Sequence, residues 1–152
     1  MRPITVFTDA SIRRGNIGLG VTYNCKNLCP LVITSARVLT PLQSKCSTTG
    51  ELLAMVFALQ IVPRHHTQLC LYSDSQAVLD FIKYDRCPDL FKTHVQMLKY
   101  MCNQREITFH KVPSAVNIAH TPSRIGALLD PTCHPKLNFA EDIQVVFKRT
   151  RC

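Results

Sequence analysis

The strongest constraint on the fold is a helix-forming segment that is apolar on almost every side. Residues 51–62 read ELLAMVFALQIV, and Pro63 ends the segment because proline cannot continue a helix. Thr48 stands three residues before Glu51, in the T-x-x-E capping-box pattern that starts many helices. A helix without a polar face has to be covered by other parts of the protein. We therefore expect this helix to lie deep in the core of a single domain, for which 152 residues suffice.

Strand-like runs precede and follow this helix. Residues 4–9 (ITVFTD), 17–24 (IGLGVTYN) and 31–39 (LVITSARVL) are joined by turns too short for a crossover helix, so an antiparallel meander is expected. Residues 68–74 (QLCLYSD) form an apolar run typical of a central parallel strand, and residues 107–112 (ITFHKV) alternate like a strand. The pattern predicts an α/β fold with a mixed five-stranded sheet, its first three strands antiparallel, flanked by helices.

Shorter helices and a polar end complete the predicted order of elements. SQAVLDFIKY (75–84) reads as a short helix, a second helix with one apolar stripe follows Pro88, and another short helix covers roughly residues 119–129. Residues 131–152 mix proline, asparagine and lysine and end in KRTRC. We therefore predict a folded domain over residues 1–130 and a loosely structured basic tail over residues 131–152.

The charge of the chain separates the classes of partner. There are 18 Lys and Arg residues against 10 Asp and Glu residues, which gives a formal net charge of +8. A surplus of this size favours a polyanionic partner such as nucleic acid, although many basic proteins bind no polyanion.

Membrane insertion and secretion are not expected. No apolar run approaches the roughly 18 to 20 residues of a membrane span. The first residues, MRPITVFTDAS, do not resemble a signal peptide, because an acid interrupts the apolar run. The eight cysteines are scattered, which favours buried thiols over disulfides, and they lack the paired spacing of a zinc site. We therefore expect an intracellular protein with no membrane partner.

Three acids stand where a folded sheet can bring them together. Asp9 and Asp74 end two strand-like runs with a helix between them, so the two strands are expected to run parallel. The carboxyl ends of parallel strands meet at one edge, where open α/β sheets bind ligands. Glu51 lies in the first turn of the intervening helix and can lean over the same edge. Converging carboxylates repel one another unless a divalent ion lies between them, and their hard oxygen atoms suit Mg²⁺ or Mn²⁺.

Each acid alone has a simpler structural explanation. Asp9 can start a turn, Glu51 can serve only as the partner in the capping box, and Asp74 can cap the helix that follows it. The order of strand and acid, helix and glutamate, strand and acid is what favours a shared metal site over three separate local roles.

Four short blocks, in order, resemble the active-site blocks of the RNase H family. They are TDAS (8–11), TTGELLAMVFAL (48–59), YSDSQAVLDFI (72–82) and VPSAVNIAHTPSR (112–124). The last block resembles the end of the RNase H domain of reverse transcriptases, and its form is closest to that of hepadnavirus-like polymerases. The resemblance covers about residues 4–128. It implies an RNase H-like fold and two-metal hydrolysis of the RNA strand of RNA–DNA hybrids.

The resemblance also implies which residues hold the two ions, Mg²⁺ or Mn²⁺. Asp9, Glu51 and Asp74 match the first three metal-binding carboxylates of the family. His120 falls where the family usually has a fourth carboxylate, an aspartate. A neutral imidazole still binds Mn²⁺ or Mg²⁺, though less tightly, and related nucleases of the same broad superfold use histidine there. The alternative is a solvated histidine at the start of a helix.

Substrate contacts and partners follow from the same resemblance. Hydroxyl and basic groups near the acids are candidate contacts to the hybrid, each with an ordinary alternative as a turn, cap or surface residue: Ser11, Arg13, Thr48, Ser75, Lys111 and Arg124. The basic substrate-gripping insertion of some cellular enzymes is missing, because only DRCP (85–88) separates the two central helices. The resemblance implies a reverse transcriptase domain in the same polyprotein as partner, with the isolated domain a monomer.

Two other functions fit the same residues. The first is a different nuclease of the superfold, a resolvase or strand transferase. An active site of three acids and a histidine is compatible with these enzymes. The second is a degenerate RNase H-like scaffold or nucleic-acid-binding domain, in which the histidine marks a lost activity. The three intact carboxylates argue against a degenerate domain, but this alternative stays open.

Overall fold

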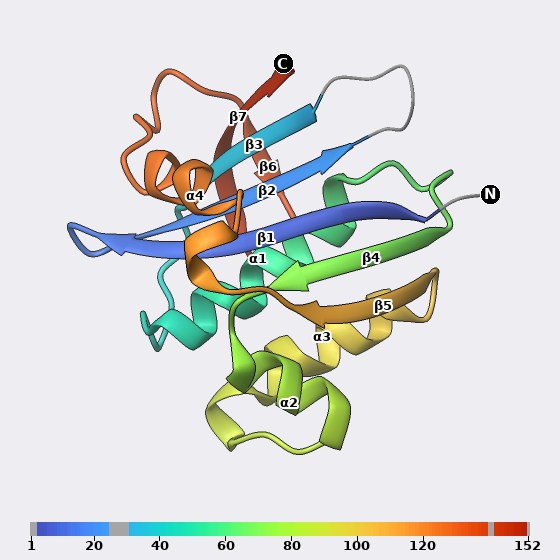
Figure 1. Ribbon diagram of the computed structural model, residues 1–152. Helices are drawn as coiled ribbons and strands as arrows, with labels where there is room; N and C mark the ends of the chain where they lie inside the picture. The colour runs from blue at the N-terminus through green and yellow to red at the C-terminus, as the bar shows by residue number, and fades with distance from the viewer. Residues whose placement is uncertain (1–2, 25–30, 140–141, 152) are drawn as a thin grey trace.

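The computed structural model describes residues 3–24, 31–139 and 142–151. Within these residues, seven strands form one sheet in the order β5-β4-β1-β2-β3-β7-β6 (Figure 1). The strands are β1 (Ile4–Arg13), β2 (Asn16–Asn24), β3 (Leu31–Val38), β4 (Gln68–Ser73), β5 (Glu106–Lys111), β6 (Lys136–Asn138) and β7 (Gln144–Arg151). The helices are α1 (Ser47–Ile61), α2 (Gln76–Tyr84), α3 (Lys92–Cys102) and α4 (His120–Gly126), with 3-10 turns at Asp89–Phe91 and Ser114–Val116.

The predicted strand directions are confirmed, but the first strand is longer than expected. β1, β2 and β3 form an antiparallel meander, and β4 pairs with β1 and with β5 in parallel. The pairing of β1 with β4 ends at Phe7↔Tyr72, whereas β1 continues along β2 as far as Arg13↔Asn16. Asp9 therefore lies within the strand, opposite Gly20, and not at its end. The hairpin with β2 supplies the hydrogen bonds that carry β1 past the acid.

Helix α1 is buried on all sides from Thr49 to Leu59, as its apolar sequence predicts. It packs against β1 and β2 on one side and α3 on the other. The side chain of Phe57 is fully buried, and its ring lies 5.3 Å from the ring of Phe139. Burial of one such side chain stabilises the fold by about 1.5 to 3 kcal/mol.

The predicted capping box at the start of α1 is wrong. The helix begins at Ser47, its cap is Cys46, and no side-chain bond caps it. Thr48 lies inside the first turn. Glu51 accepts a hydrogen bond from the backbone N–H of Ala10 in β1, because its carboxylate is buried against the sheet and does not reach back along its own helix.

The expected five-stranded sheet and loose C-terminal tail are also corrected by the structure. Residues 136–138 and 144–151 form β6 and β7, and β7 pairs antiparallel with β3 from Val32↔Arg151 to Val38↔Val145. Val145 and Val146 are fully buried. The short apolar run inside the basic segment therefore completes the core and pairs with the otherwise open edge of β3.

Helices cover the two faces of the sheet unequally (Figure 1). α1 and α3 lie on one face, and the short α4 lies on the other, across β1, β2 and β3. Gly18 and Gly20 of β2 make this contact possible, because a Cβ atom at either position would overlap the backbone of Ser123 or Ala119. The glycines thus determine how closely the start of α4 packs against the sheet beside β1.

Two smaller expectations concern cysteines and membranes. Five described cysteines are free thiols, four of them half-buried and Cys133 exposed; Cys25, Cys29 and Cys152 lie outside the described residues. No disulfide is expected among the five, although they are less buried than the sequence suggested.

In the described part of the chain, none of the helices has the length and apolar character needed to cross a bilayer.

Candidate metal centre

Three carboxylates meet at one edge of the sheet. Asp9 comes from β1, Glu51 from the second turn of α1, and Asp74 is the residue after β4. One oxygen atom from each lies within 4.8 Å of the others. Asp9 is 3% exposed and Glu51 is 7% exposed. The oxygen atoms of Asp9 and Glu51 are therefore shielded from bulk water, and those of the half-buried Asp74 lie at the open side of the cluster.

Strand register explains why the two aspartates meet. Phe7 and Tyr72 are the last paired residues of the parallel strands β1 and β4, and each aspartate stands two positions further along. Gly50 lets α1 approach β1, since a Cβ atom there would lie 2.9 Å from the Cβ of Ala10. The backbone N–H of Ala10 then donates to Asp9 Oδ1 (2.8 Å) and to Glu51 Oε1 (3.0 Å).

The electrostatics of the site disfavour three ionised carboxylates. Burial, the hydrogen bond to Asp9 and the charges of Asp9 and Asp74 raise the pKa of Glu51 to about 10. Burial and the charge of Asp9 also raise the pKa of Asp74, against the opposing effects of hydrogen bonds from Ser114 and Asn117. A cation between the carboxylates would relieve both effects.

The residues present fit a hard divalent ion. Glu51 Oε2 is buried and has no hydrogen-bond partner among the described residues, which leaves a strong acceptor unsatisfied. Oxygen donors of this kind bind Mg²⁺ and Mn²⁺. The unpaired oxygen and the mutual repulsion of the carboxylates are both removed when such an ion is bound.

His120 lies beside the carboxylates. It is the first residue of α4, and its Nδ1 atom is 2.9 Å from Asp9 Oδ2, although the side chain is 52% exposed. The structure therefore brings His120 together with the three acids, at the rim of the site. Its contact to Asp9 is a hydrogen bond between the side chains, and its role as a ligand stays a prediction.

Sequence reasoning missed the residues that hold His120 in place. Asn117 is buried; its Nδ2 donates to the backbone carbonyl of Thr8 (3.0 Å), and its Oδ1 accepts from the N–H of Ala119 (3.1 Å). Ser123 Oγ donates to the carbonyl of His120 (2.6 Å). Both residues lie in the block at 112–124, so the signal was present, but a polar residue there does not reveal its partner.

The predicted hydroxyl contacts have partners inside the protein. Ser11 Oγ lies 2.6 Å from Ser123 Oγ, which links β1 to α4. Ser75 Oγ accepts from the N–H of Val78 and caps α2. Thr48 is half-buried in the first turn of α1, near Glu51 in sequence. Two of these three side chains therefore have structural roles, and contact of any of them with a substrate is untested.

The predicted basic contacts differ in their distance from the site. Lys111 Nζ donates to the backbone carbonyl of Asp74 (2.6 Å), which places a positive charge beside the carboxylates. Arg13 is half-buried at the end of β1, and Arg124 is exposed on α4. Neither arginine forms an ion pair with a described residue, so both charges are available to an anion.

Three solved structures that are similar to this chain contain RNase H domains. The RNase H1 of the halophilic archaeon Halobacterium salinarum matches with a TM-score of 0.63 and 13% identity, over 78% of this chain and 91% of that one. LC11-RNase H1 in complex with an RNA/DNA hybrid matches with a TM-score of 0.67 and 16% identity, over 82% and 96%. The N-terminal RNase H domain of rv2228c from Mycobacterium tuberculosis, in a fusion with maltose binding protein, matches with a TM-score of 0.63 and 14% identity, over 84% and 97%.

Sequence comparison alone does not place the chain. No protein-family model matches it, and no curated protein matches its sequence. The likeness is therefore one of architecture, at 13 to 16% sequence identity. The chain has the RNase H-like fold.

Proposed function

We propose that this protein is a metal-dependent ribonuclease H that hydrolyses the RNA strand of RNA–DNA hybrids. The observation that carries the proposal is the cluster of buried Asp9 and Glu51 with half-buried Asp74, in which Glu51 Oε2 has no protein partner among the described residues. A cluster of this charge is costly to bury without a cation. Its place on an RNase H-like fold connects that cation to phosphodiester hydrolysis.

Asp9, Glu51, Asp74 and His120 would hold two divalent ions, Mg²⁺ or Mn²⁺. Bound ions of this kind lower the pKa of an attacking water and stabilise the leaving 3′ oxygen. Asp9 is central, since it contacts His120 directly and shares the N–H of Ala10 with Glu51. Lys111 limits the accumulated negative charge by lowering the pKa of Asp74.

The hybrid is the substrate class that the fold favours. LC11-RNase H1, which has the same architecture, is known in complex with an RNA/DNA hybrid. Recognition of such a duplex rests on its shape and on 2′-hydroxyl contacts more than on base sequence. The net charge of +8 suits a polyanion of this kind.

The motif resemblance carries a finer proposal about context. The block at 112–124 supports an RNase H domain of a viral or retroelement polymerase, similar to those of hepadnavirus-like viruses. In that setting the reverse transcriptase domain is the partner, the isolated domain is a monomer, and its location is intracellular.

The decisive experiment follows the fate of an end-labelled RNA–DNA hybrid in Mg²⁺ and, separately, in Mn²⁺. The variants are Asp74→Asn, which removes a ligand charge, and His120→Asp, which supplies the usual carboxylate. We expect cleavage of the RNA strand that is lost in Asp74→Asn and kept or increased in His120→Asp. No cleavage by either the natural protein or His120→Asp would contradict the proposal and favour a binding scaffold.

A branched DNA substrate in the same assay tests the resolvase alternative. His120 at the fourth position is the observation that keeps this alternative open. If the protein cleaves branched DNA and leaves the hybrid uncut, the result would contradict the ribonuclease proposal and favour a different nuclease of the same superfold.

A further inference from the structure

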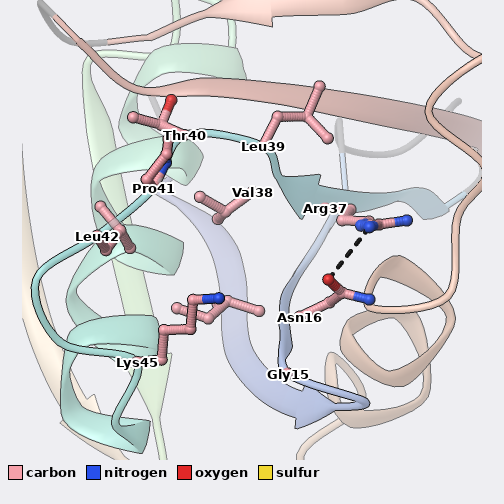
Figure 2. Close-up of a pocket in the computed structure, with 10 residues that line it drawn as sticks. Gly15, Asn16, Arg37, Val38, Leu39, Thr40, Pro41, Leu42 and Lys45 are labelled. Atoms are coloured by element: carbon pink, nitrogen blue, oxygen red, sulfur yellow. Dashed lines mark hydrogen bonds between the residues drawn. The ribbon is translucent and has the colours of Figure 1, made fainter.

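Two pockets of the structure differ in chemistry. The first lies beside the hairpin between β1 and β2 and contains charged and polar side chains, with Lys45 facing Arg37, which donates to Asn16 Oδ1 (Figure 2). The second, which we call the α4–β7 pocket, has a volume of about 260 Å³ and lies between α4 and the strands β3 and β7. Four of its lining side chains are apolar: Ile33, Ile118, Pro122 and Ile125.

Strand register explains how the α4–β7 pocket forms. Helix α4 packs against β1, β2 and β3, and β7 continues the sheet beyond β3. Gly126 lets α4 approach closely, since a Cβ atom there would lie 2.3 Å from a backbone oxygen of β3. Thr150 pairs with Ile33 and Lys148 pairs with Ser35, and all four residues line the pocket. The pocket is therefore a trough between the side of α4 and the strand that extends the sheet.

The apolar wall of the trough comes from α4 and the loop before it. Ile118 precedes the helix, and Pro122 and Ile125 stand three residues apart within it, the spacing of one helix face. Pro122 is buried, whereas Ile118 is 46% exposed and Ile125 is 45% exposed. Two large aliphatic side chains thus remain partly in water at the mouth of one pocket. A partner that covers them gains the free energy of removing apolar area from water.

The polar groups of the α4–β7 pocket favour a negatively charged partner. No acidic residue lines it, and Lys148 is exposed and forms no ion pair with a described residue. Ser35 is only 4% exposed, and its hydroxyl group has no hydrogen-bond partner among the described residues. A carboxylate at the rim would pair with the ammonium group and accept from the hydroxyl.

Size and chemistry select a protein segment as the occupant. The volume of about 260 Å³ is below the range of about 300–1,000 Å³ that encloses drug-sized molecules, whereas protein interfaces place single anchor side chains in pockets. A second copy of this chain carries the same net charge of +8, which opposes pairing of two such surfaces. Single-stranded nucleic acid binds on aromatic rings, and the walls of this pocket are aliphatic.

We propose that the α4–β7 pocket is a docking site for an acidic protein segment. The segment inserts one leucine or phenylalanine side chain between Ile118 and Ile125 and pairs a carboxylate with Lys148. Lys148 lies in the same cross-strand row as Asp9, so three strand spacings, roughly 14 Å, separate the two residues. Because α4 packs on the strands between them, a docked segment leaves the carboxylate cluster open. The proposal does not depend on the proposed nuclease activity.

The test measures the binding of two short fluorescent peptides by anisotropy at several salt concentrations. In one peptide a single leucine is flanked by glutamates, and in the other alanine replaces that leucine. Ile125→Ser is compared with Leu90→Ser, because Leu90 is a 53% exposed leucine just before α3, on the other face of the sheet. Lys148→Gln is compared with Arg64→Gln, a change at another exposed cation, beyond the end of α1.

We expect the leucine peptide to bind the natural protein more tightly than the alanine peptide. Ile125→Ser should weaken binding of the leucine peptide roughly five-fold or more, as expected for an anchor pocket. Lys148→Gln should weaken it roughly two- to three-fold and reduce its dependence on salt. Leu90→Ser and Arg64→Gln should change neither quantity. Equal binding of the two peptides, or equal effects of Ile125→Ser and Leu90→Ser, would overturn the docking site.

Ile118→Ser provides a second variant, since Ile118 lies outside the helix and its substitution leaves α4 intact. It should weaken the leucine peptide in the same direction, and an unchanged affinity would contradict insertion between the two isoleucines.

Other occupants are distinguished with the same variants. Sedimentation of the natural protein as a dimer that Ile125→Ser dissociates would overturn the proposal in favour of a second copy. Weaker binding of an RNA–DNA hybrid by Lys148→Gln, with no effect of Ile125→Ser on either peptide, would assign Lys148 to a nucleic-acid surface instead.

Discussion

Near each end of α1 lies a buried side chain, and the two are of opposite kinds. Phe57 is fully buried among apolar residues and lies against the ring of Phe139. Glu51, in the second turn of the same helix, is 7% exposed, and one of its carboxylate oxygens has no protein partner among the described residues. The first burial stabilises the fold by removing apolar area from water. The second opposes folding until a cation or a proton reaches the carboxylate.

This contrast shows that one helix carries both a side chain that stabilises the fold and a side chain of the candidate site. Equal burial does not mean equal contribution to stability, because the free energy depends on what the buried atoms contact. If the contrast is correct, substitutions at the two ends of α1 have separable effects on activity and stability.

The largest effect is expected from Glu51→Gln. Hydrolysis of the hybrid should fall on the order of 10³-fold or more, about 4 kcal/mol of transition-state stabilisation, since the amide carries no charge to hold the ions. In the absence of metal, the free energy of unfolding should rise, because the amide is neutral like the protonated acid. Single-turnover cleavage and urea unfolding measure the two quantities.

Glu106→Gln is the matched control for this change. Glu106 is an exposed acid on β5, so its substitution should affect neither quantity appreciably. Loss of stability in metal-free Glu51→Gln would contradict the comparison of the two helix ends.

Phe57→Ala should destabilise the protein by about 3 to 5 kcal/mol, through lost burial and the cavity left beside Phe139. Phe57→Leu, which keeps most of the volume, should cost less than about 1.5 kcal/mol. Urea unfolding gives both values. Below its unfolding temperature, Phe57→Leu should cleave hybrid at the natural rate, and a large loss of activity would show that the two ends are not separable.

Divalent metal should stabilise the natural protein. At a concentration 100 times its dissociation constant, a bound ion adds about 2.7 kcal/mol to the free energy of unfolding. The increase should disappear with EDTA and in Glu51→Gln. Thermal unfolding in Mg²⁺ and in Mn²⁺ measures this stabilisation by bound metal. An unchanged melting temperature in both metals would point to a collapsed site.

Counted per pH unit, the smallest effect is the pH dependence of the metal-free protein. The pKa of Glu51 is raised from 4.5 to about 10 in the folded state, so between these values the unfolded chain binds fewer protons than the folded one. Stability from this group is therefore full below pH 4.5 and is lost as pH rises toward 10, by up to about 1.4 kcal/mol per pH unit. The raised pKa of Asp74 acts in the same direction.

Urea unfolding in EDTA across the neutral range measures that slope. The natural protein should lose stability as pH rises, and Glu51→Gln should show a smaller slope. Saturating Mg²⁺ should weaken the dependence, because the ion binds the ionised carboxylates. A flat profile for the metal-free natural protein would mean that Glu51 is solvated in solution.

Several elements could be read from the sequence because their signals are local. The apolar run ending at Pro63 predicted α1, and the three short-turn strands predicted the meander. The order of Asp9, Glu51 and Asp74 predicted a cluster, which the structure forms. Each of these follows from spacing along the chain or from the direction of neighbouring strands.

Other features depend on partners far away in the chain and could not be read in this way. The segment at 144–151 looks like a basic tail, and only the open edge of β3 makes it a strand. Glu51 matches a capping box, yet its partner is Ala10 in another element. The hydroxyl of Ser11 suggests a substrate contact until Ser123 is found beside it.

The sequence by itself determined the buried helix α1, the meander of β1 to β3 and the parallel pair β4 and β5, and it indicated that Asp9, Glu51 and Asp74 come together. Only the tertiary structure decided that one oxygen of Glu51 has no described partner, that His120 contacts Asp9, and that Ile125 and Lys148 line one pocket. The physical reason is range. Helix and strand preferences act over a few residues, whereas desolvation and charge interactions depend on every group that folding brings within a few ångströms.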